Sequence, residues 1–147
     1  MAIDVGQQAP DFTLVNEENE KVTLSELRGS PVVLMFYPFS FSPPCTAEAC
    51  EVRDSYSSWM DKGAQVFGVS GDSRFVQAAF KAQEQFPYSL LADLKGDVAR
   101  QYGCWNDQIG VAERATVVID REGQVVYSIH NPITQTRDHA EVEQYIQ

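Results

Sequence analysis

The sequence has little positive charge. Its 147 residues carry 11 lysines and arginines against 21 aspartates and glutamates, which gives a formal net charge of −10 at pH 7. Because nucleic acids and anionic membrane surfaces repel a protein of this charge, we expect neither as a partner. A solvated acidic surface accounts for the charge without any binding function.

Long hydrophobic runs are also lacking. No segment approaches the ~20 apolar residues that cross a membrane, so we expect no spanning helix. The first residues show neither a basic region nor an apolar stretch of signal length, so we expect a cytoplasmic protein. There is no repeat or linker, and the length suits one domain with a sizeable core, so we expect residues 1–147 to form a single domain.

Cysteine and histidine are scarce and widely spaced. The three cysteines and two histidines follow no compact zinc-binding spacing, so we expect no metal site and no cofactor. The Cys-x-x-Cys motif that disulfide reductases use is absent as well. Because structural disulfides are rare in the cytoplasm, catalysis is the better role for a cysteine here.

One cysteine stands where a buried strand meets a helix. Pro31–Tyr37 is a short apolar segment rich in β-branched residues, which predicts a strand buried on both faces. Pro43 and Pro44 favour the start of the helix that follows, so Cys45 lies at a helix N-terminus above the carboxyl end of the strand. The positive end of a helix dipole favours the nucleophilic thiolate. Cys45 is therefore a candidate reactive cysteine.

The helix after Cys45 is expected to point its two cysteines in different directions. Its predicted buried face consists of Cys45, Ala49, Val52, Tyr56, Trp59 and Met60. Cys50 lies about 140° around the helix from Cys45, at roughly 100° per residue, and so on the predicted polar side. The roles of the two thiols should therefore differ.

The remaining segments alternate between strands and helices. We expect a hairpin of residues 12–15 and 21–24, a strand at 65–70, a helix capped by Asp72 or Ser73, a strand at 89–91, a helix at 97–102, a hairpin of 115–119 and 124–129, and a closing helix capped by Asp138. The predicted apolar face of the second long helix is Phe75, Val76, Ala79, Phe80 and Ala82. This order predicts an α/β fold, with a mixed central sheet flanked by helices and an N-terminal β-hairpin.

Motifs along nearly the whole chain resemble those of one family. Pro38-x3-Ser42-x2-Cys45 resembles the Pro-x3-Thr/Ser-x2-Cys signature of the peroxiredoxins, the AhpC/TSA family. The similarity continues through three further segments, Ala9–Phe12, Gln101–Gly110 and Glu113–Asp120. These segments look most like the alkyl hydroperoxide reductase E subfamily. Cys50, five residues after Cys45, instead resembles the second cysteine of the bacterioferritin-comigratory, or Q-type, members.

The resemblance implies a thioredoxin-like fold and a thiol peroxidase that reduces hydrogen peroxide and organic hydroperoxides. The Cys45 thiolate would attack one peroxide oxygen, expel water or an alcohol, and become a sulfenic acid. Cys50 would resolve that acid as an intramolecular disulfide. The subfamily further implies a homodimer recycled by thioredoxin, by a mycoredoxin–mycothiol pair or by a glutaredoxin.

Four further residues of the motifs have both a catalytic and a structural interpretation. Arg114 is placed by the resemblance in the active site, where it would favour the thiolate and donate hydrogen bonds to the peroxide; otherwise it forms a surface salt bridge with a neighbouring glutamate. Ser42 either bonds the peroxide or is a turn residue. Pro38 rigidifies the loop and, by resemblance, shields the thiolate. Glu48 either joins the active-site network or is a favourable acid in the first helical turn.

Helix geometry opposes a direct disulfide between Cys45 and Cys50. On an intact helix their Cα atoms are roughly 8.6 Å apart, whereas a disulfide needs about 4.4–6.8 Å. The first turn or two must therefore unwind, and we expect residues around 45–51 to rearrange. This opening should be cheap, because a first turn has few internal hydrogen bonds.

Several alternatives stay open from the sequence. A one-cysteine cycle would rely on an external low-molecular-weight thiol or a mycoredoxin. A redox sensor would change a partner surface when Cys45 is oxidised, without turnover, and a structural scaffold would not depend on Cys45 at all. Cys104 is interpreted as structural. Four apolar residues form either a rim around the pocket or a subunit contact, namely Phe39, Phe41, Trp105 and Ile109.

Overall fold

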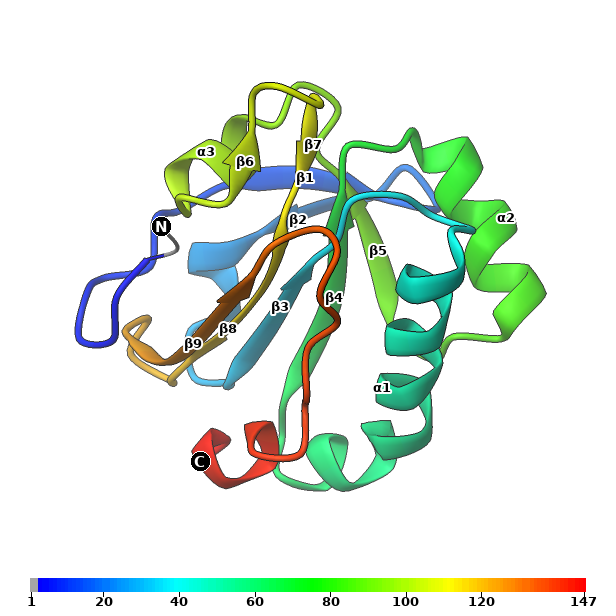
Figure 1. The fold of residues 1–147 in the computed structure, drawn as a ribbon. Helices are drawn as coiled ribbons and strands as arrows, with labels where there is room; N and C mark the ends of the chain where they lie inside the picture. Colours follow the sequence, from blue (N-terminus) through cyan, green and yellow to red (C-terminus); the bar gives the residue numbers. More distant parts are fainter. Residues whose placement is uncertain (1–2) are drawn as a thin grey trace.

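The computed structural model describes residues 3–147 and shows a seven-stranded sheet between two layers of helices (Figure 1). In the order in which they pair, the strands are β2 (Lys21–Thr23), β1 (Thr13–Asn16), β5 (Ser89–Ala92), β4 (Gln65–Ser70), β3 (Val32–Phe36), β8 (Arg114–Ile119) and β9 (Val125–Asn131). β3, β4 and β5 run parallel, and the other pairs are antiparallel, so the sheet is mixed as predicted. Two short strands, β6 (Trp105–Asn106) and β7 (Val111–Ala112), form a separate ribbon.

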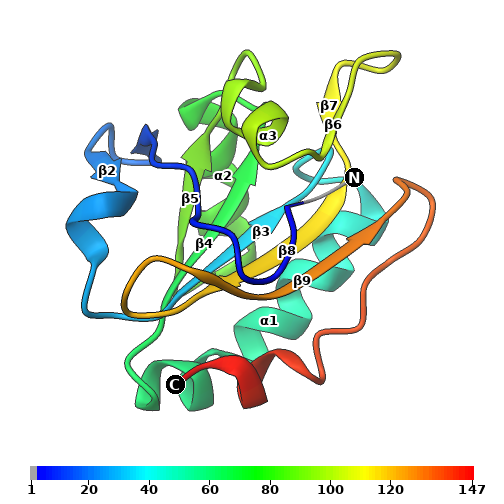
Figure 2. The ribbon, with the colours of Figure 1, turned by 90° about the vertical axis from the view of Figure 1, so that its left-hand side faces the viewer.

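The helices divide between the two faces of the sheet (Figure 2). α1 (Pro43–Asp61), α2 (Arg74–Glu84) and the C-terminal segment with the 3-10 turn η2 (Val142–Tyr145) cover one face. α3 (Asp97–Gln101) and the N-terminal residues cover the other, and the 3-10 turn η1 (Leu24–Leu27) follows β2. Within residues 3–147, none of the helices has both the length and the apolar composition to cross a membrane.

The central strand β3 explains why its sequence is apolar without a break. Val32, Leu34 and Phe36 pack into the core beneath α3, whereas Val33 and Met35 pack into the core beneath α1 and α2. Successive side chains of a strand point to opposite faces, so a strand covered on both sides needs apolar residues at every position. The prediction of a doubly buried strand before Cys45 is therefore confirmed.

The predicted apolar face of α2 is right for Phe80 and otherwise wrong. Phe75 and Val76 are 68% and 38% exposed, whereas the helix buries the polar Gln77 together with Phe80. The Gln77 Nε2 donates hydrogen bonds to the Ser70 Oγ (3.1 Å) and to the Leu91 carbonyl (2.7 Å). Polar anchoring of this kind fixes the rotation of the helix, and hydrophobic periodicity cannot register it.

Two smaller expectations also need correction. Met60, predicted on the buried face of α1, is 50% exposed at the end of that helix. The closing helix is only the single 3-10 turn η2, although Asp138 does accept a hydrogen bond from the backbone of Ala140 (2.9 Å) as a cap would. Elsewhere the predicted hairpins, strands and helices are present, with the second long helix capped by Ser73.

Candidate active site

Cys45 lies in the first turn of α1, where the loop after β3 enters the helix, and its side chain is only 2% exposed. Pro43 and Pro44 have no N–H, and the Thr46 N–H donates to the Ser42 carbonyl (2.9 Å). In the part of the chain that the structure describes, nothing accepts a hydrogen bond from the backbone N–H of Cys45. The two prolines thus leave this N–H as the free donor at the positive end of the helix.

The loop between β3 and α1 is held in place from two sides. Pro38 is buried, and the backbone of Ser40 donates to the Asp72 carboxylate (2.9 Å). Phe41 adopts a φ of 70°, which is strained for a bulky residue, and its ring packs on Phe80 with a centroid distance of 5.0 Å. The loop therefore presents Cys45 in a fixed position.

Ser42 is the N-cap residue of α1, but its side chain makes no capping bond. Its hydroxyl donates instead to the Phe39 carbonyl at 3.1 Å, within the loop. That contact fits the turn interpretation of Ser42. The hydroxyl oxygen can still accept a hydrogen bond from a ligand.

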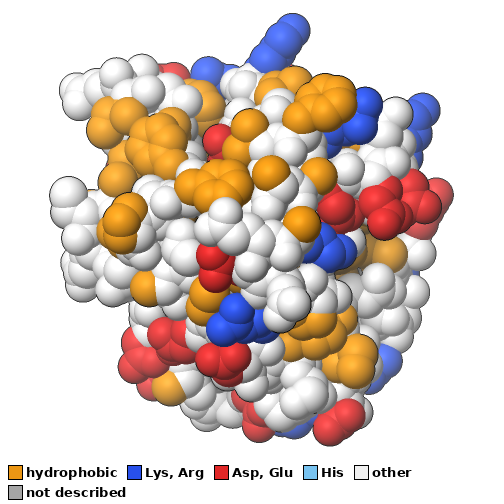
Figure 3. All heavy atoms as spheres, turned by 90° about the vertical axis from the view of Figure 1, so that its right-hand side faces the viewer, with side chains coloured by type: hydrophobic (Ala, Val, Ile, Leu, Met, Phe, Trp, Pro, Cys, Tyr) orange, Lys and Arg blue, Asp and Glu red, His pale blue; other side chains and the backbone are white. Residues whose placement is uncertain are grey.

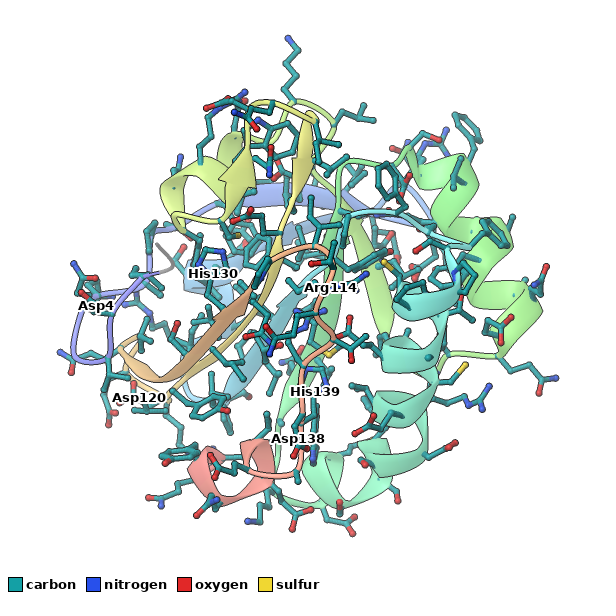
Figure 4. All side chains as sticks on the ribbon, viewed as in Figure 1. Asp4, Arg114, Asp120, His130, Asp138 and His139 are labelled. Atoms are coloured by element: carbon teal, nitrogen blue, oxygen red, sulfur yellow. The ribbon has the colours of Figure 1, made fainter. Side chains whose placement is uncertain are left out.

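Glu48 is buried one turn after Cys45, between two buried arginines. Arg114 Nη1 donates to Glu48 Oε1 at 2.5 Å. Arg137 donates from Nη2 to Oε1 (3.0 Å) and from Nε and its backbone N–H to Oε2 (3.1 and 2.5 Å). Figure 4 shows Arg114 between the sheet and α1. The alternative of a surface salt bridge for Arg114 is therefore wrong, since the guanidinium is buried and its carboxylate partner is on α1.

This cluster carries an excess of positive charge. Burial raises the pKa of Glu48, but the hydrogen bonds and charge of Arg137, with the charge of Arg114, outweigh burial and lower it. Glu48 is therefore ionised and offsets one of the two guanidinium charges. The remaining positive charge favours an anion beside the start of α1, where Cys45 lies. Cys45, Glu48 and Arg137 line the same small cavity.

The guanidinium of Arg114 has one nitrogen without an acceptor among the described residues. Its Nε donates to the Ile133 carbonyl (2.7 Å) and its Nη1 to Glu48, which fixes the plane of the guanidinium. Among residues 3–147, none accepts a hydrogen bond from Nη2. A guanidinium held on one side with a free nitrogen on the other is suited to bind a polar ligand.

Sequence reasoning missed Arg137. It stands in the irregular segment after β9, which runs between the sheet and α1 (orange to red in Figure 1). Besides Glu48, its Nη1 donates to the carbonyls of Phe36 (2.6 Å) and Ala115 (2.7 Å) at the ends of β3 and β8. No motif surrounds it, so nothing in the sequence signals that a distant arginine reaches the cluster.

His139, two residues further on, extends the buried polar contacts (Figure 4). Thr116 Oγ1 lies 2.8 Å from His139 Nε2 and accepts a hydrogen bond from Arg137 Nη1 (3.2 Å). When the Thr116 hydroxyl donates its one proton to Nε2, the proton of the neutral histidine lies on Nδ1. Nδ1 is buried, and it has no hydrogen-bond partner among residues 3–147. Burial, followed by the charge of Arg137, lowers the pKa of His139 from 6.5 to about 4.

A neutral, buried His139 predicts that the protein loses stability in mild acid. The unfolded chain binds this proton near pH 6.5 and the folded one only near pH 4, so the stabilisation is complete above 6.5 and falls as the pH drops toward 4. Between pH 7.5 and pH 5 the free energy of unfolding should fall by about 2 kcal/mol from this residue. Urea titrations at the two pH values measure the loss.

The two histidines of the chain supply the variants for this test. His139→Phe removes the titrating group and keeps a ring against Trp59, whose ring centroid lies 6.4 Å away, so this pH-dependent loss should vanish. His130→Gln, at a half-buried site beside Glu113, should keep it. If the wild type and His139→Phe lose the same free energy of unfolding between pH 7.5 and pH 5, the loss does not come from His139.

The other two cysteines occupy different environments. Cys50 was predicted to point outward, yet it is half-buried and its Sγ donates to Glu84 Oε1 on α2 at 3.3 Å. Burial and this hydrogen bond raise its pKa. Cys104 is fully buried, and burial raises the pKa of its thiol to about 12, as suits an unreactive core residue. All three cysteines are free thiols.

Hydrophobic side chains gather on the upper part of the face that α1 and α2 form (Figure 3). Near the starts of these helices, Phe39 and Phe41 are each 42% exposed, and Phe75 and Val76 of α2 are exposed as well. Ile109 is also exposed, whereas Trp105 is half-buried with the guanidinium of Arg100 over its ring.

Residues 5–128 match the model of the AhpC/TSA family. A chloroplastic peroxiredoxin Q of Suaeda salsa is 39% identical over 93% of this chain and 64% of its own length, so the chain spans about two thirds of that relative. Peroxiredoxin Bcp of Bacillus subtilis is 38% identical over 86% of this chain and 84% of its own.

Solved structures of the same kind superimpose on the fold. Peroxidoxin BcpB from Mycobacterium tuberculosis has a TM-score of 0.86 at 33% identity, covering 97% of this chain and 94% of that one. AhpC of Enterococcus faecalis has a TM-score of 0.89 at 26% identity, covering 95% of this chain and 88% of that one. The likeness confirms the thioredoxin-like fold that the motifs implied.

Proposed function

The chain belongs to the AhpC/TSA family, whose members are thiol-dependent peroxidases, and on that premise we propose that Cys45 is the thiol that reduces peroxide. One observation carries the proposal. Cys45 sits at the positive end of α1 beside a buried cluster of two arginines and one glutamate, which has a net positive charge. Both features favour the negative charge that moves onto a departing oxygen during the reaction.

The first half of the cycle is a displacement at oxygen. The Cys45 thiolate attacks one oxygen of hydrogen peroxide or an organic hydroperoxide, the O–O bond breaks, and the departing oxygen takes up a proton and leaves as water or an alcohol. The free Nη2 of Arg114 and the backbone N–H of Cys45 are the donors for the two oxygens. Ser42 adds a hydroxyl beside them, and Pro38 limits access of water to the thiolate.

Glu48 acts in this scheme as a positioning residue. It accepts hydrogen bonds from both guanidinium groups and so sets the direction in which Arg114 offers its free nitrogen. Arg137, absent from the sequence motifs, adds its charge from the C-terminal segment and bridges the ends of β3 and β8. The site is thus assembled from residues far apart in the chain.

In the second half of the cycle the Cys50 thiol resolves the sulfenic acid of Cys45, forming an S–S bond and releasing water. Because both cysteines lie on α1, the start of the helix must unwind. Opening residues 45–51 separates Glu48 from both arginines, Cys50 from Glu84, and the Ala49 carbonyl from the Tyr88 hydroxyl (2.8 Å). The opening therefore costs more than a bare first turn suggests.

The remaining assignments follow from family membership. A thioredoxin-type reductant recycles the disulfide, with a mycoredoxin or a glutaredoxin as the other two possibilities, and residues 1–147 act as one peroxiredoxin domain. The chain is proposed to form a homodimer, and the exposed Phe39, Phe41 and Phe75 supply an apolar surface for a second copy. A cytoplasmic location stays a prediction.

Peptide mapping after oxidation tests the cycle. With one equivalent of hydrogen peroxide, mass spectrometry should find Cys45 linked to Cys50 and Cys104 still free, with faster amide exchange across residues 45–51 than in the reduced protein. Excess dithiol should sustain peroxide consumption well beyond one equivalent. A persistent Cys45 sulfenic acid, converted to a mixed disulfide only by an added thiol, would contradict the resolving role of Cys50 and point to a one-cysteine cycle.

A further inference from the structure

Cys50 is tied to the end of the neighbouring helix by Glu84. The Cys50 Sγ donates to Glu84 Oε1 (3.3 Å), and the other carboxylate oxygen accepts from Gln83 Nε2 (3.1 Å). The Glu84 carbonyl accepts a hydrogen bond from Arg53 Nη1 (2.7 Å), one turn along α1 from Cys50. Glu84 is also the last residue of α2, where the helix dipole is negative.

The carboxylate acts on the protonation of the thiol. A thiol that donates a hydrogen bond to a carboxylate is stabilised in its protonated form, because deprotonation would leave two negative groups in contact. Besides Glu84, the charged or titratable groups around Cys50 are Arg53 and Asp54 on α1 and the hydroxyl of Tyr88, the residue before β5. Arg53 favours the thiolate, whereas burial, Glu84 and Asp54 oppose it.

We propose that Glu84 is a brake on the resolution step: its carboxylate holds Cys50 as a docked, protonated thiol and so prolongs the life of the Cys45 sulfenic acid. The inference rests on the proposed peroxidase cycle, in which Cys50 is the resolving thiol. It adds that an acidic residue on a different helix, outside every motif of the sequence, sets the rate of that step.

The chemistry of resolution shows where the brake acts. Cys50 must first lose its proton to solvent, after which its thiolate attacks the sulfenic sulfur of Cys45. The S–S bond forms, the S–O bond breaks, and the departing hydroxide takes up a proton to become water. The rate follows the fraction of Cys50 that is thiolate and the access of its sulfur to Cys45. Glu84 lowers the thiolate fraction and restrains the movement of the sulfur.

The test compares the wild type with Glu84→Gln and with Glu51→Gln as a matched control. Glu51 is an exposed carboxylate directly beside Cys50 in sequence, so its replacement removes the same charge without removing a hydrogen bond to the thiol. Each full-length protein is mixed with one equivalent of hydrogen peroxide and quenched at intervals. Alkylation and mass spectrometry then follow the loss of free Cys45 and free Cys50 separately.

Glu84→Gln should consume the Cys50 thiol faster at pH 7 by about 2- to 10-fold, the range that one hydrogen bond represents. The loss of the Cys45 thiol should keep its wild-type rate, because Glu84 contacts neither Cys45 nor the arginine cluster. Glu51→Gln should behave as the wild type. If resolution in Glu84→Gln is unchanged or slower, the proposal that Glu84 slows this step is overturned. Slower resolution would show that Glu84 is a base that promotes the step.

A second measurement separates this proposal from the peroxidase cycle itself. In the reduced proteins, the rate at which iodoacetamide alkylates Cys50 is followed against pH without any peroxide. The profile of Glu84→Gln should lie at lower pH than those of the wild type and Glu51→Gln, and coincident profiles would overturn the brake. If the wild type forms no Cys45–Cys50 disulfide, the resolving role fails, while this profile still decides whether Glu84 controls the protonation of Cys50.

Discussion

Replacing Cys45 by serine is expected to abolish peroxide reduction while the fold survives. Serine is nearly isosteric with cysteine, but at neutral pH it is a far weaker nucleophile, so turnover should fall by on the order of a thousandfold or more. Steady-state consumption of hydrogen peroxide with dithiothreitol as the recycling thiol measures the loss. Thermal unfolding of the variant checks that the buried site at the start of α1 still packs.

The other cysteines provide the controls for this experiment. Cys104→Ala, at a fully buried site in the opposite core, should keep the peroxidase rate. Cys50→Ser should keep the first reaction with peroxide and lose only the intramolecular disulfide. Peroxidase activity that persists in Cys45→Ser, with Cys50 intact, would remove Cys45 from its role. A wild type that consumes a single equivalent and then stops would favour a redox sensor.

Local chemistry made much of the fold predictable from the sequence. The unbroken apolar run of β3 follows from its burial on both faces, and the two prolines at 43 and 44 define where α1 begins. The same local features located Cys45, because they lie within a few residues of it. The position of Arg114 at the start of β8 also followed from its motif, although its partner did not.

Contacts between distant segments are what the sequence could not reveal. Glu48 had two open interpretations because the sequence gives no indication that Arg114 and Arg137 meet at its carboxylate, 66 and 89 residues away. His139 was likewise no candidate, since its pKa depends on burial and on Arg137 rather than on its neighbours. Periodicity failed for α2 because Gln77 is anchored by hydrogen bonds to β4 and β5.

Helix geometry predicts correctly on which side of α1 the Cys50 side chain lies, but it does not predict what surrounds that side chain. The side chain does lie away from Cys45 around α1, as the spacing predicts. However, α2 ends against this side of α1, so the thiol meets Glu84 instead of solvent. Sequence patterns describe one helix at a time, whereas the surroundings of Cys50 depend on how two helices pack.

Replacing Glu48 by glutamine should destabilise the protein strongly. Arg114 and Arg137 each have side chains only 2% exposed, and their shared carboxylate is 5% exposed. Removing one partner of a buried ion pair leaves uncompensated charge, so the free energy of unfolding should fall by about 3–5 kcal/mol at pH 7. Denaturant titration measures the change. Glu51→Gln, an exposed acid on the same helix, should stay within about 0.5 kcal/mol of the wild type.

The pH dependence of this deficit identifies charge as its cause. The lowered pKa of Glu48 means that its carboxylate stabilises the fold above its ordinary pKa of 4.5, and that this stabilisation is lost as the pH falls through the lower folded value. Glutamine resembles the protonated acid. The difference in the free energy of unfolding between the wild type and Glu48→Gln should therefore narrow as the pH falls below 4.5. A gap of the same size at pH 7 and in acid would instead assign the effect to shape. The same contacts hold the first turns of α1, so Glu48→Gln should also exchange its amides faster across residues 45–51 in the reduced state.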